Sequence, residues 1–323
     1  MVVYTIRRLL LMFPILLGVL LVTYTLGFYG PGDPLVIMFG EEERIPDPEI
    51  LARLKKIHGL DRPFQVQFGD YLGVWKNGRG EFDGLLQGNF GTSLIDKRPV
   101  NEKIRIGMPV SFQLGIASAI VMVVFGVPLG ILAAIKQNSW IDYLIIAGAI
   151  AVRSVPVFVL APMLMIVLVL KLHVFEHVPI GWDGVFSMAA VLPVALMAAT
   201  SILLVIRMAR AGIIEVLSEN YVRTARAKGL SERLVISRHV MKNAMTPVLT
   251  SMGLALSGLV TGAIFVELIF SVPGLALAGI SAFRSRDYPV ILAVTVIGGF
   301  FIILSNLLVD LGYGLLDPRV RYE

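Results

Sequence analysis

VSFQLGIASAIVMVVFGVPLGILAAI, the stretch from Val110 to Ile135, contains 26 residues and no charged side chain. An α-helix rises about 1.5 Å per residue, so about 20 apolar residues are enough to cross the hydrocarbon core of a bilayer. The stretch therefore predicts a transmembrane helix, and it sets the class of structure to which the rest of the chain must conform.

Five further apolar runs have the length of a membrane span: Leu9–Phe28, Tyr143–Leu172, Phe186–Met208, Val248–Phe270 and Pro289–Leu311. The chain is 56% hydrophobic and 16% charged, with a mean hydropathy of +0.81, outside the range of soluble globular domains. We expect an all-α integral membrane protein with six transmembrane helices. The first run is too long for the apolar part of a signal peptide and no small-residue cleavage site follows it, so we expect a retained anchor.

Lys and Arg in the short loops predict the orientation of the chain in the membrane. The basic residues that flank the expected spans on one side are Arg7, Arg8, Lys136, Arg207, Arg210, Arg223, Arg226, Lys228, Arg233, Arg238, Lys242, Arg319 and Arg321. The other side has Lys171, Arg284 and Arg286. We therefore expect both termini, and the loop between spans four and five, in the cytoplasm.

Residues 30–109 form the large polar region of the chain, and they are expected outside the cell. The predicted organisation is a first transmembrane helix (1–29), this extracytoplasmic region (30–109) and a five-helix core (110–323). Pro46–Lys56 predicts a short helix that Asp47 can cap, and Leu85–Leu94 predicts turns with a short extended piece. A lid or docking platform fits this composition better than a separate enzyme domain.

Residues that could carry catalysis are scarce. The chain has no cysteine and no GxxxxGK[ST] phosphate-binding loop, so we expect no ATPase activity and no enzyme. His173, Glu176 and His177 spell HxxEH, a zinc-binding pattern in some metallopeptidases, but no third ligand is evident. We interpret them as interfacial residues and expect no metal site and no nucleic-acid partner. A membrane-bound peptidase is one alternative, and a stand-alone secondary transporter is another, although no inverted repeat is evident.

Polar residues inside the expected spans are candidates for a pore or gate, because a charge at the bilayer centre costs ~2.5–3.5 kcal/mol on insertion scales. Arg153 lies near the middle of the third span, beside Ser154 and Pro156. It either lines a water-filled path or pairs with a partner subunit. Glu267, followed by Phe270, lies towards the outer end of the fifth span, where we expect a gate contact.

Prolines and glycines inside the spans predict how the helices bend and pack. Spans two to four are interrupted by Pro128, Pro156, Pro162 and Pro193, so we expect bent helices around a cavity. Two glycine pairs have the GxxxG spacing that lets helices approach closely: Gly126 with Gly130, and Gly258 with Gly262. We interpret both pairs as packing faces.

The loop between spans four and five reads YVRTARAKGLSERLVISRHVMKN, from Tyr221 to Asn243. Tyr221–Lys228 lacks Gly and Pro and is rich in Ala and Arg, which predicts a helix. Gly229 can take the left-handed conformation that ends a helix, and Ser231 with Glu232 can start the next one. We expect a helix, a turn and a second helix, which either rest on anionic membrane lipid or receive the push of a partner protein.

The order and spacing of several short pieces resemble the B-type membrane subunit of bacterial and archaeal dipeptide, oligopeptide and nickel ABC importers. The pieces are PGDP (31–34), GLDRP (59–63), GNFGTSL (88–94), SVPVF (154–158), Arg223–Pro247, FSVPGL (270–275), RDYP (286–289) and Asn306–Arg321 with its LLDPRVR. Together they cover nearly the whole chain.

The resemblance implies a type I importer permease fold, in which this chain forms half of the translocation pore. A second homologous permease would supply the other half, and an external binding protein would deliver the substrate. One or two cytoplasmic ABC ATPases would bind ATP and Mg²⁺, so no cofactor is expected in this chain. The implied substrates are di- or oligopeptides, with nickel chelates, sugars or glutathione as alternatives, and the implied location is a bacterial or archaeal cell membrane.

The resemblance also makes residues 209–247 the EAA loop, with a coupling helix at about Ala225 to Val235 that sits in a groove of the ATPase. The residues so implied in coupling are Ala225, Arg226, Ala227, Lys228, Gly229, Leu230, Ser231, Glu232 and Arg233. The chain departs from the general motif, because Arg223, Thr224 and Ala225 stand where that motif has Glu-Ala-Ala. A role for the missing glutamate therefore does not apply here.

Overall fold

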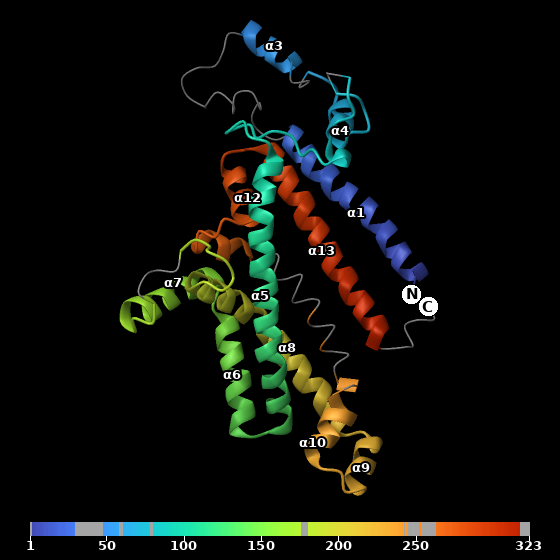
Figure 1. The fold of residues 1–323 in the computed structure, drawn as a ribbon, viewed down its shortest axis with the longest axis vertical. Helices are drawn as coiled ribbons and strands as arrows, with labels where there is room; N and C mark the ends of the chain where they lie inside the picture. The colour runs from blue at the N-terminus through green and yellow to red at the C-terminus, as the bar shows by residue number, and fades with distance from the viewer. Residues whose placement is uncertain are drawn as a thin grey trace. The chain divides into compact units, whose positions relative to one another are not determined.

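The computed structural model describes residues 2–29, 48–57, 61–77, 80–175, 180–241, 243–244, 248, 252 and 263–316 (Figure 1). The chain forms two compact units. One comprises Met1–Leu9, Val110–Val272 and Phe301–Glu323, and the other comprises Leu10–Pro109 and Pro273–Phe300. The outer region predicted from the sequence thus groups with a segment from near the end of the chain.

The first unit is built around a helical hairpin. α5 (Val100–Ile135), most of which belongs to this unit, and α6 (Trp140–Ser154) are joined by a tight turn and run side by side (Figure 1). α8 (Met188–Leu217) packs against α6. This unit also contains α7 (Val157–Met165), the π-helical turn η2 (Ile166–Lys171), α9 (Asn220–Ala227), α10 (Glu232–Leu234) and the π-helical turn η3 (Val235–Val240).

In the described part of the chain, four helical segments are long and apolar enough to cross a membrane: Leu10–Tyr29 of α1 (Val2–Tyr29), α5, α8 and Tyr288–Leu307 of α13 (Tyr288–Leu316). These confirm four of the predicted spans. The third predicted span is two helices, Trp140–Ser154 and Val157–Lys171, bent by 102° into a broken span or a re-entrant loop. Most of the fifth predicted span, Val248–Phe270, lies outside the described residues. Within this span, the described residues 263–269 are helical.

The break between α6 and α7 occurs at a proline. Val155 has the extended angles φ −92° and ψ 122°, and Pro156 is the N-cap of α7. Proline has no backbone N–H and disfavours the helical conformation in the residue before it, which accounts for the break. The prediction that a proline interrupts the span is confirmed at Pro156. The same prediction is wrong for Pro128, Pro162 and Pro193, which lie inside continuous helices.

α5 and α8 pack closely through Gly126 and Gly130. A Cβ atom on Gly126 would lie 3.0 Å from Cγ1 of Val205. One on Gly130 would lie 2.6 Å from Cβ of Ala209 and 2.8 Å from the carbonyl oxygen of Ile206. The interpretation of this GxxxG pair as a packing face is confirmed, whereas Gly258 and Gly262 lie outside the described residues.

We expect Gly130→Ala to separate α5 from α8 and lower the melting temperature of the purified protein, because the added methyl would overlap Ala209 and the backbone of α8. Overpacking of this kind costs about 1–3 kcal/mol. The matched control is Gly115→Ala on the same helix, where a Cβ atom meets nothing within 4 Å. Equal melting temperatures for the two variants would show that the close approach does not contribute to stability.

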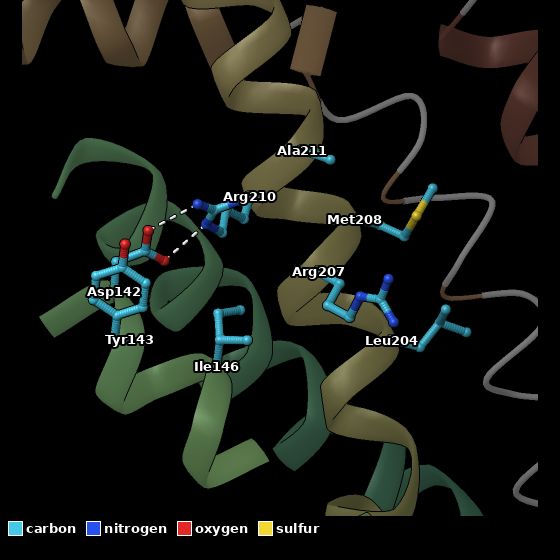
Figure 2. Close-up of a pocket in the computed structure, with 8 residues that line it drawn as sticks. All are labelled: Asp142, Tyr143, Ile146, Leu204, Arg207, Met208, Arg210 and Ala211. Atoms are coloured by element: carbon cyan, nitrogen blue, oxygen red, sulfur yellow. Dashed lines mark hydrogen bonds and ion pairs between the residues drawn. The ribbon is translucent and has the colours of Figure 1, made fainter. Parts of the chain in front are cut away.

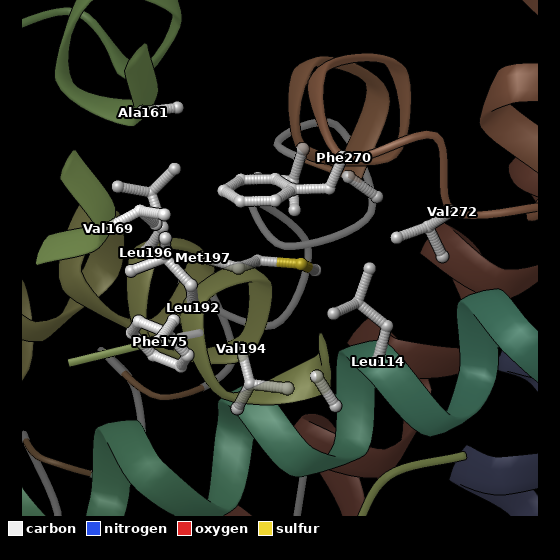
Figure 3. Packing of buried hydrophobic residues seen from close by; sticks show 13 residues of the cluster. Leu114, Ala161, Val169, Phe175, Leu192, Val194, Leu196, Met197, Phe270 and Val272 are labelled. Carbon is white, nitrogen blue, oxygen red and sulfur yellow. The ribbon is translucent and has the colours of Figure 1, made fainter. Parts of the chain in front are cut away.

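A buried apolar cluster joins several helices of the first unit (Figure 3). Leu114 of α5, Ala161 of α7 and Met197 of α8 meet in it around Phe270, whose side chain is fully buried. Since lipid tails are as apolar as these side chains, interlocking packing rather than the hydrophobic effect stabilises such helix contacts in a membrane.

The second unit contains the polar region 30–109. Its further helices are α3 (Pro48–Ile57), α4 (Phe64–Leu72), the 3₁₀ turn η1 (Leu85–Gln87) and α12 (Leu275–Arg284). The predicted helix at Pro46–Lys56 is confirmed as α3, while Asp47 lies outside the described residues. The predicted turns at Leu85–Leu94 are confirmed as η1, followed by an isolated bridge between Thr92 and Pro99.

Aromatic rings attach α4 to the end of α1. The ring centroid of Tyr24 lies 5.8 Å from that of Phe64, 5.2 Å from that of Phe68 and 5.5 Å from that of Tyr71. On the same helix, a Cβ atom on Gly27 would lie 3.2 Å from the ring of Tyr288. The end of α1 therefore supports α4 of the polar region.

A buried carboxylate joins the polar region to the start of α13. Asp287 is 2% exposed and accepts hydrogen bonds from the hydroxyl of Ser93 at 2.5 Å and the N–H of Leu94 at 3.0 Å. Lys103 lies 2.8 Å from Asp96, and its hydrogen bond lowers the pKa of Asp96 to about 2. The sequence pieces GNFGTSL and RDYP, far apart in the chain, therefore meet in one polar network.

Candidate functional site

The basic loop, which we define as Asn220 to Met241, follows α8 directly. It consists of α9, a turn at Gly229, α10 and η3. The predicted helix, turn and second helix are confirmed, with one difference. Most of the second helix is a π-helical turn, a feature that is frequent at functional sites.

Gly229 adopts the left-handed conformation that the sequence predicted, with φ +77°. Its N–H donates to the carbonyl of Arg226 at 2.9 Å, and the N–H of Leu230 donates to the carbonyl of Ala225 at 3.4 Å. This pair of bonds is the Schellman motif, which satisfies carbonyl groups at the end of α9. A Cβ atom at position 229 would meet nothing within 4 Å, so the backbone conformation alone favours glycine.

Ser231 begins the second helix, as predicted. Its backbone is extended, and its carbonyl accepts hydrogen bonds from the N–H groups of Leu234 and Val235 at 2.9 and 3.0 Å. Its hydroxyl makes no capping hydrogen bond, so only its backbone carbonyl takes part in the first hydrogen bonds of the helix.

Arg226 and Glu232 form an ion pair across the Gly229 turn. Nε of Arg226 donates to Oε2 of Glu232 at 3.1 Å, and Nη2 donates to Oε1 at 2.6 Å. These hydrogen bonds lower the pKa of Glu232 and raise the pKa of Arg226. Both side chains are exposed, so the pair adds only about 0–1 kcal/mol to stability. The pair joins the residues on the two sides of the turn.

Buried apolar side chains attach the basic loop to the ends of two long helices. Val222, Ala225 and Val235 are buried in one cluster with Ala134 of α5 and Ile213 of α8. Because interiors are closely packed, the loop and these helix ends form one stiff body. The loop is therefore packed directly against both helix ends.

The other face of the basic loop is exposed and mostly cationic. Of the nine residues implied in coupling, Ala225 is buried and Leu230 is half-buried. The exposed ones are Arg226, Ala227, Lys228, Gly229, Ser231, Glu232 and Arg233. Since Glu232 is paired with Arg226, the face keeps the positive charges of Lys228 and Arg233, and its role in coupling stays a prediction.

Three pore candidates lie at the break between α6 and α7. The guanidinium of Arg153 donates a hydrogen bond to the carbonyl of Thr200 in α8. The hydroxyl of Ser154 donates to the carbonyl of Ile150 at 2.8 Å, and Pro156 begins α7. Arg153 thus links the broken helix to α8, and its place in a pore stays a prediction.

The two outer gate candidates are buried. Glu267 is fully buried and accepts a hydrogen bond from the hydroxyl of Ser111 at 2.6 Å. Phe270 is also fully buried, and its carbonyl accepts the N–H of Gly181 at 2.8 Å. The two charged candidates are therefore held by different helices, Glu267 by α5 and Arg153 by α8, and a gate role for Glu267 and Phe270 stays a prediction.

The sequence reasoning missed a buried ion pair between α6 and α8. Figure 2 shows Arg210 reaching Asp142, with Nε to Oδ1 at 2.7 Å and Nη2 to Oδ2 at 2.8 Å. The side chain of Asp142 is 3% exposed and also accepts the N–H of Asn138 at 3.0 Å. Ser139, the N-cap of α6, accepts the N–H of Asp142, and this Ser-x-x-Asp spacing is the signal that could have marked the site.

Among the described residues, no group of three His, Asp or Glu side chains could hold a metal ion. Glu176 and His177 of the HxxEH pattern lie outside the described residues.

Two family comparisons together cover most of the chain. Residues 1–115 match the N-terminal part of the binding-protein-dependent transport system membrane component, and residues 126–322 match the binding-protein-dependent transport system inner membrane component.

Curated relatives match the chain from end to end. The dipeptide transport system permease protein of Alkalihalophilus pseudofirmus is 34% identical over 100% of both chains. The glutathione transport system permease protein of Salmonella typhimurium is 36% identical over 99% of both, and the dipeptide transport system permease protein of Escherichia coli K12 is 35% identical over 100% of both.

Among solved structures, a chain of the MetNI methionine ABC transporter in an inward facing conformation matches with a TM-score of 0.57 at 15% identity. The match covers 66% of this chain and 96% of that one. At this identity the likeness concerns the fold alone.

Proposed function

The chain belongs to the family of binding-protein-dependent transport system inner membrane components, and from that premise we propose that it is the transmembrane permease subunit of an ATP-driven peptide importer. The type I importer permease fold expected from the sequence is confirmed by the likeness to MetNI. In this function the chain forms half of a translocation pore, and a second homologous permease forms the other half.

The names of the relatives support a short peptide as substrate. Relatives named for dipeptide and for glutathione match over the whole chain at similar identity. Glutathione is itself a tripeptide, so the chemistry shared by these substrates is a peptide of a few residues. We take di- and oligopeptides as the first candidates and glutathione as the second.

The basic loop supports a mechanism in which a separate ATPase drives the pore. The single observation that carries this proposal is the preformed Gly229 turn, which sits on a buried cluster shared with α5 and α8. A partner that moves the turn also moves the inner ends of both helices, which are held together at Gly130. Both termini and this loop face the cytoplasm in the proposed orientation, so that the loop meets the ATPase.

The exposed residues of the basic loop determine which properties the binding groove of its partner must have. Lys228 and Arg233 are exposed beside the turn, and the exposed fraction of Leu234 is 39%. A complementary groove would present carboxylates or backbone carbonyls around an apolar pocket, because cations left unpaired at an interface core are costly.

Reconstitution tests the proposed function. Vesicles are prepared with this chain, a second homologous permease, the ABC ATPases and an external binding protein, and uptake of a labelled dipeptide and of labelled glutathione is measured. We expect uptake that needs ATP and every one of these components. Uptake by this chain alone, driven by an ion gradient, would identify a secondary transporter and contradict the proposal.

A further inference from the structure

An open pocket of about 500 Å³ lies between α6 and α8, outside the basic loop (Figure 2). One part of its wall is apolar, made by Ile146, Leu204, Met208 and Ala211. The other part is polar and includes Tyr143, Arg207 and the Asp142–Arg210 pair. The pocket therefore combines an apolar groove with cationic side chains.

Arg207 supplies the uncompensated positive charge of this pocket. Arg210 and Asp142 neutralise each other through their two hydrogen bonds. Arg207, one turn away on α8, extends away from that pair in Figure 2 and is exposed. It makes no hydrogen bond or ion pair with the residues that the structure describes. An anion placed at Arg207 would therefore not compete with a protein carboxylate there.

The surroundings of the pocket place it at the membrane surface. Trp140 is 72% exposed and Tyr143 is 65% exposed, and both lie in the first turns of α6. Lys136, in the turn before α6, is exposed as well. Exposed Trp and Tyr side chains gather where the hydrocarbon core meets the lipid headgroups. In the proposed orientation this level belongs to the cytoplasmic leaflet.

We propose that the pocket binds an anionic phospholipid of the cytoplasmic leaflet, with the phosphate at the guanidinium of Arg207 and an acyl chain along Ile146, Leu204 and Met208. Basic pockets between transmembrane helices on the cytoplasmic side suit lipid headgroups. A free phosphate ion would use the charge of Arg207 but not the apolar wall, whereas a phospholipid satisfies both. The bound lipid bridges α6 and α8 beside their buried ion pair.

Lipid titration of the intact complex tests this proposal. The complex is purified with its partner subunits, and binding of phosphatidylglycerol and of phosphatidylcholine is measured by native mass spectrometry. A basic residue near an anionic surface contributes about 1 kcal/mol, so we expect Arg207→Gln to weaken phosphatidylglycerol binding roughly fivefold. Phosphatidylcholine binding should weaken less, because its choline cation offsets the charge of its phosphate. The matched control is Lys136→Gln, which removes a cation from the neighbouring turn but not from the pocket.

A second variant tests the apolar half. Ala211→Trp keeps every charge and fills the groove, so we expect it also to weaken phosphatidylglycerol binding, with co-purification of the partner subunits as the check on folding. Equal losses for Lys136→Gln and Arg207→Gln would overturn the proposal in favour of diffuse surface attraction. Displacement of the lipid by inorganic phosphate would overturn it in favour of a simple anion site. A cross-link from position 208 to the second permease would show that protein fills the groove, and would also overturn it.

Discussion

Replacing Gly229 by proline is expected to abolish ATP-dependent uptake in the reconstituted importer, while the chain still inserts and assembles. Proline holds φ near about −65°, whereas this position has φ +77°, and proline also removes the N–H that bonds to Arg226. The turn would then be rebuilt, and the Arg226–Glu232 pair would lose its alignment. The measurements are uptake of labelled peptide and ATP hydrolysis by the same vesicles.

Gly229→Asn is the matched control for this prediction. Asparagine enters the left-handed region more readily than other residues with a side chain, and a Cβ atom meets nothing within 4 Å there. We therefore expect it to keep most of the uptake. If the proline variant transports peptide as well as the asparagine variant, the geometry of this turn is not needed for coupling.

Removing either partner of the Asp142–Arg210 pair is expected to destabilise the protein strongly. A buried ion that loses its partner costs about 3–5 kcal/mol. Arg210→Ala leaves the 3% exposed carboxylate of Asp142 unpaired, whereas Asp142→Ala leaves the 28% exposed side chain of Arg210 unpaired, so the loss of Asp142 lies at the lower end of that range. Asp142→Ala also deprives the N–H of Asn138 of its acceptor. We expect both single variants to melt well below the unchanged protein in detergent.

The double variant tests whether Asp142 and Arg210 stabilise the protein as a pair or independently. With both charges removed, no buried charge is left unpaired, so Asp142→Ala with Arg210→Ala should be less destabilised than the sum of the single changes. Additive losses in the melting curves would show that the two side chains act independently, against the geometry of Figure 2.

Features determined by local sequence were predictable from it. The run from Val110 to Ile135 became part of one long helix because its apolar length leaves the backbone no other way to satisfy its hydrogen bonds in lipid. Gly229 was predicted correctly for a similar reason, since the left-handed conformation depends on the residue itself.

Features determined by tertiary packing were not predictable. Four prolines carried the same local signal, yet only Pro156 of the four ends a helix, because neighbouring contacts decide whether a membrane helix tolerates the lost hydrogen bond. Asp142 and Arg210 are 68 residues apart, and no periodicity in the sequence relates them. Arg226 and Glu232 were both predicted in the coupling segment, but their pairing depends on the path of the chain through the turn.

The folded backbone of the Gly229 turn has a thermodynamic consequence. Because the turn is already folded in the free subunit, a partner that docks on it has little chain ordering to impose. Calorimetry of that association should therefore show a heat-capacity change set by the contact area alone, without the larger change that accompanies coupled folding. The rate of association should then be limited by diffusion and orientation, not by a wait for the turn to form.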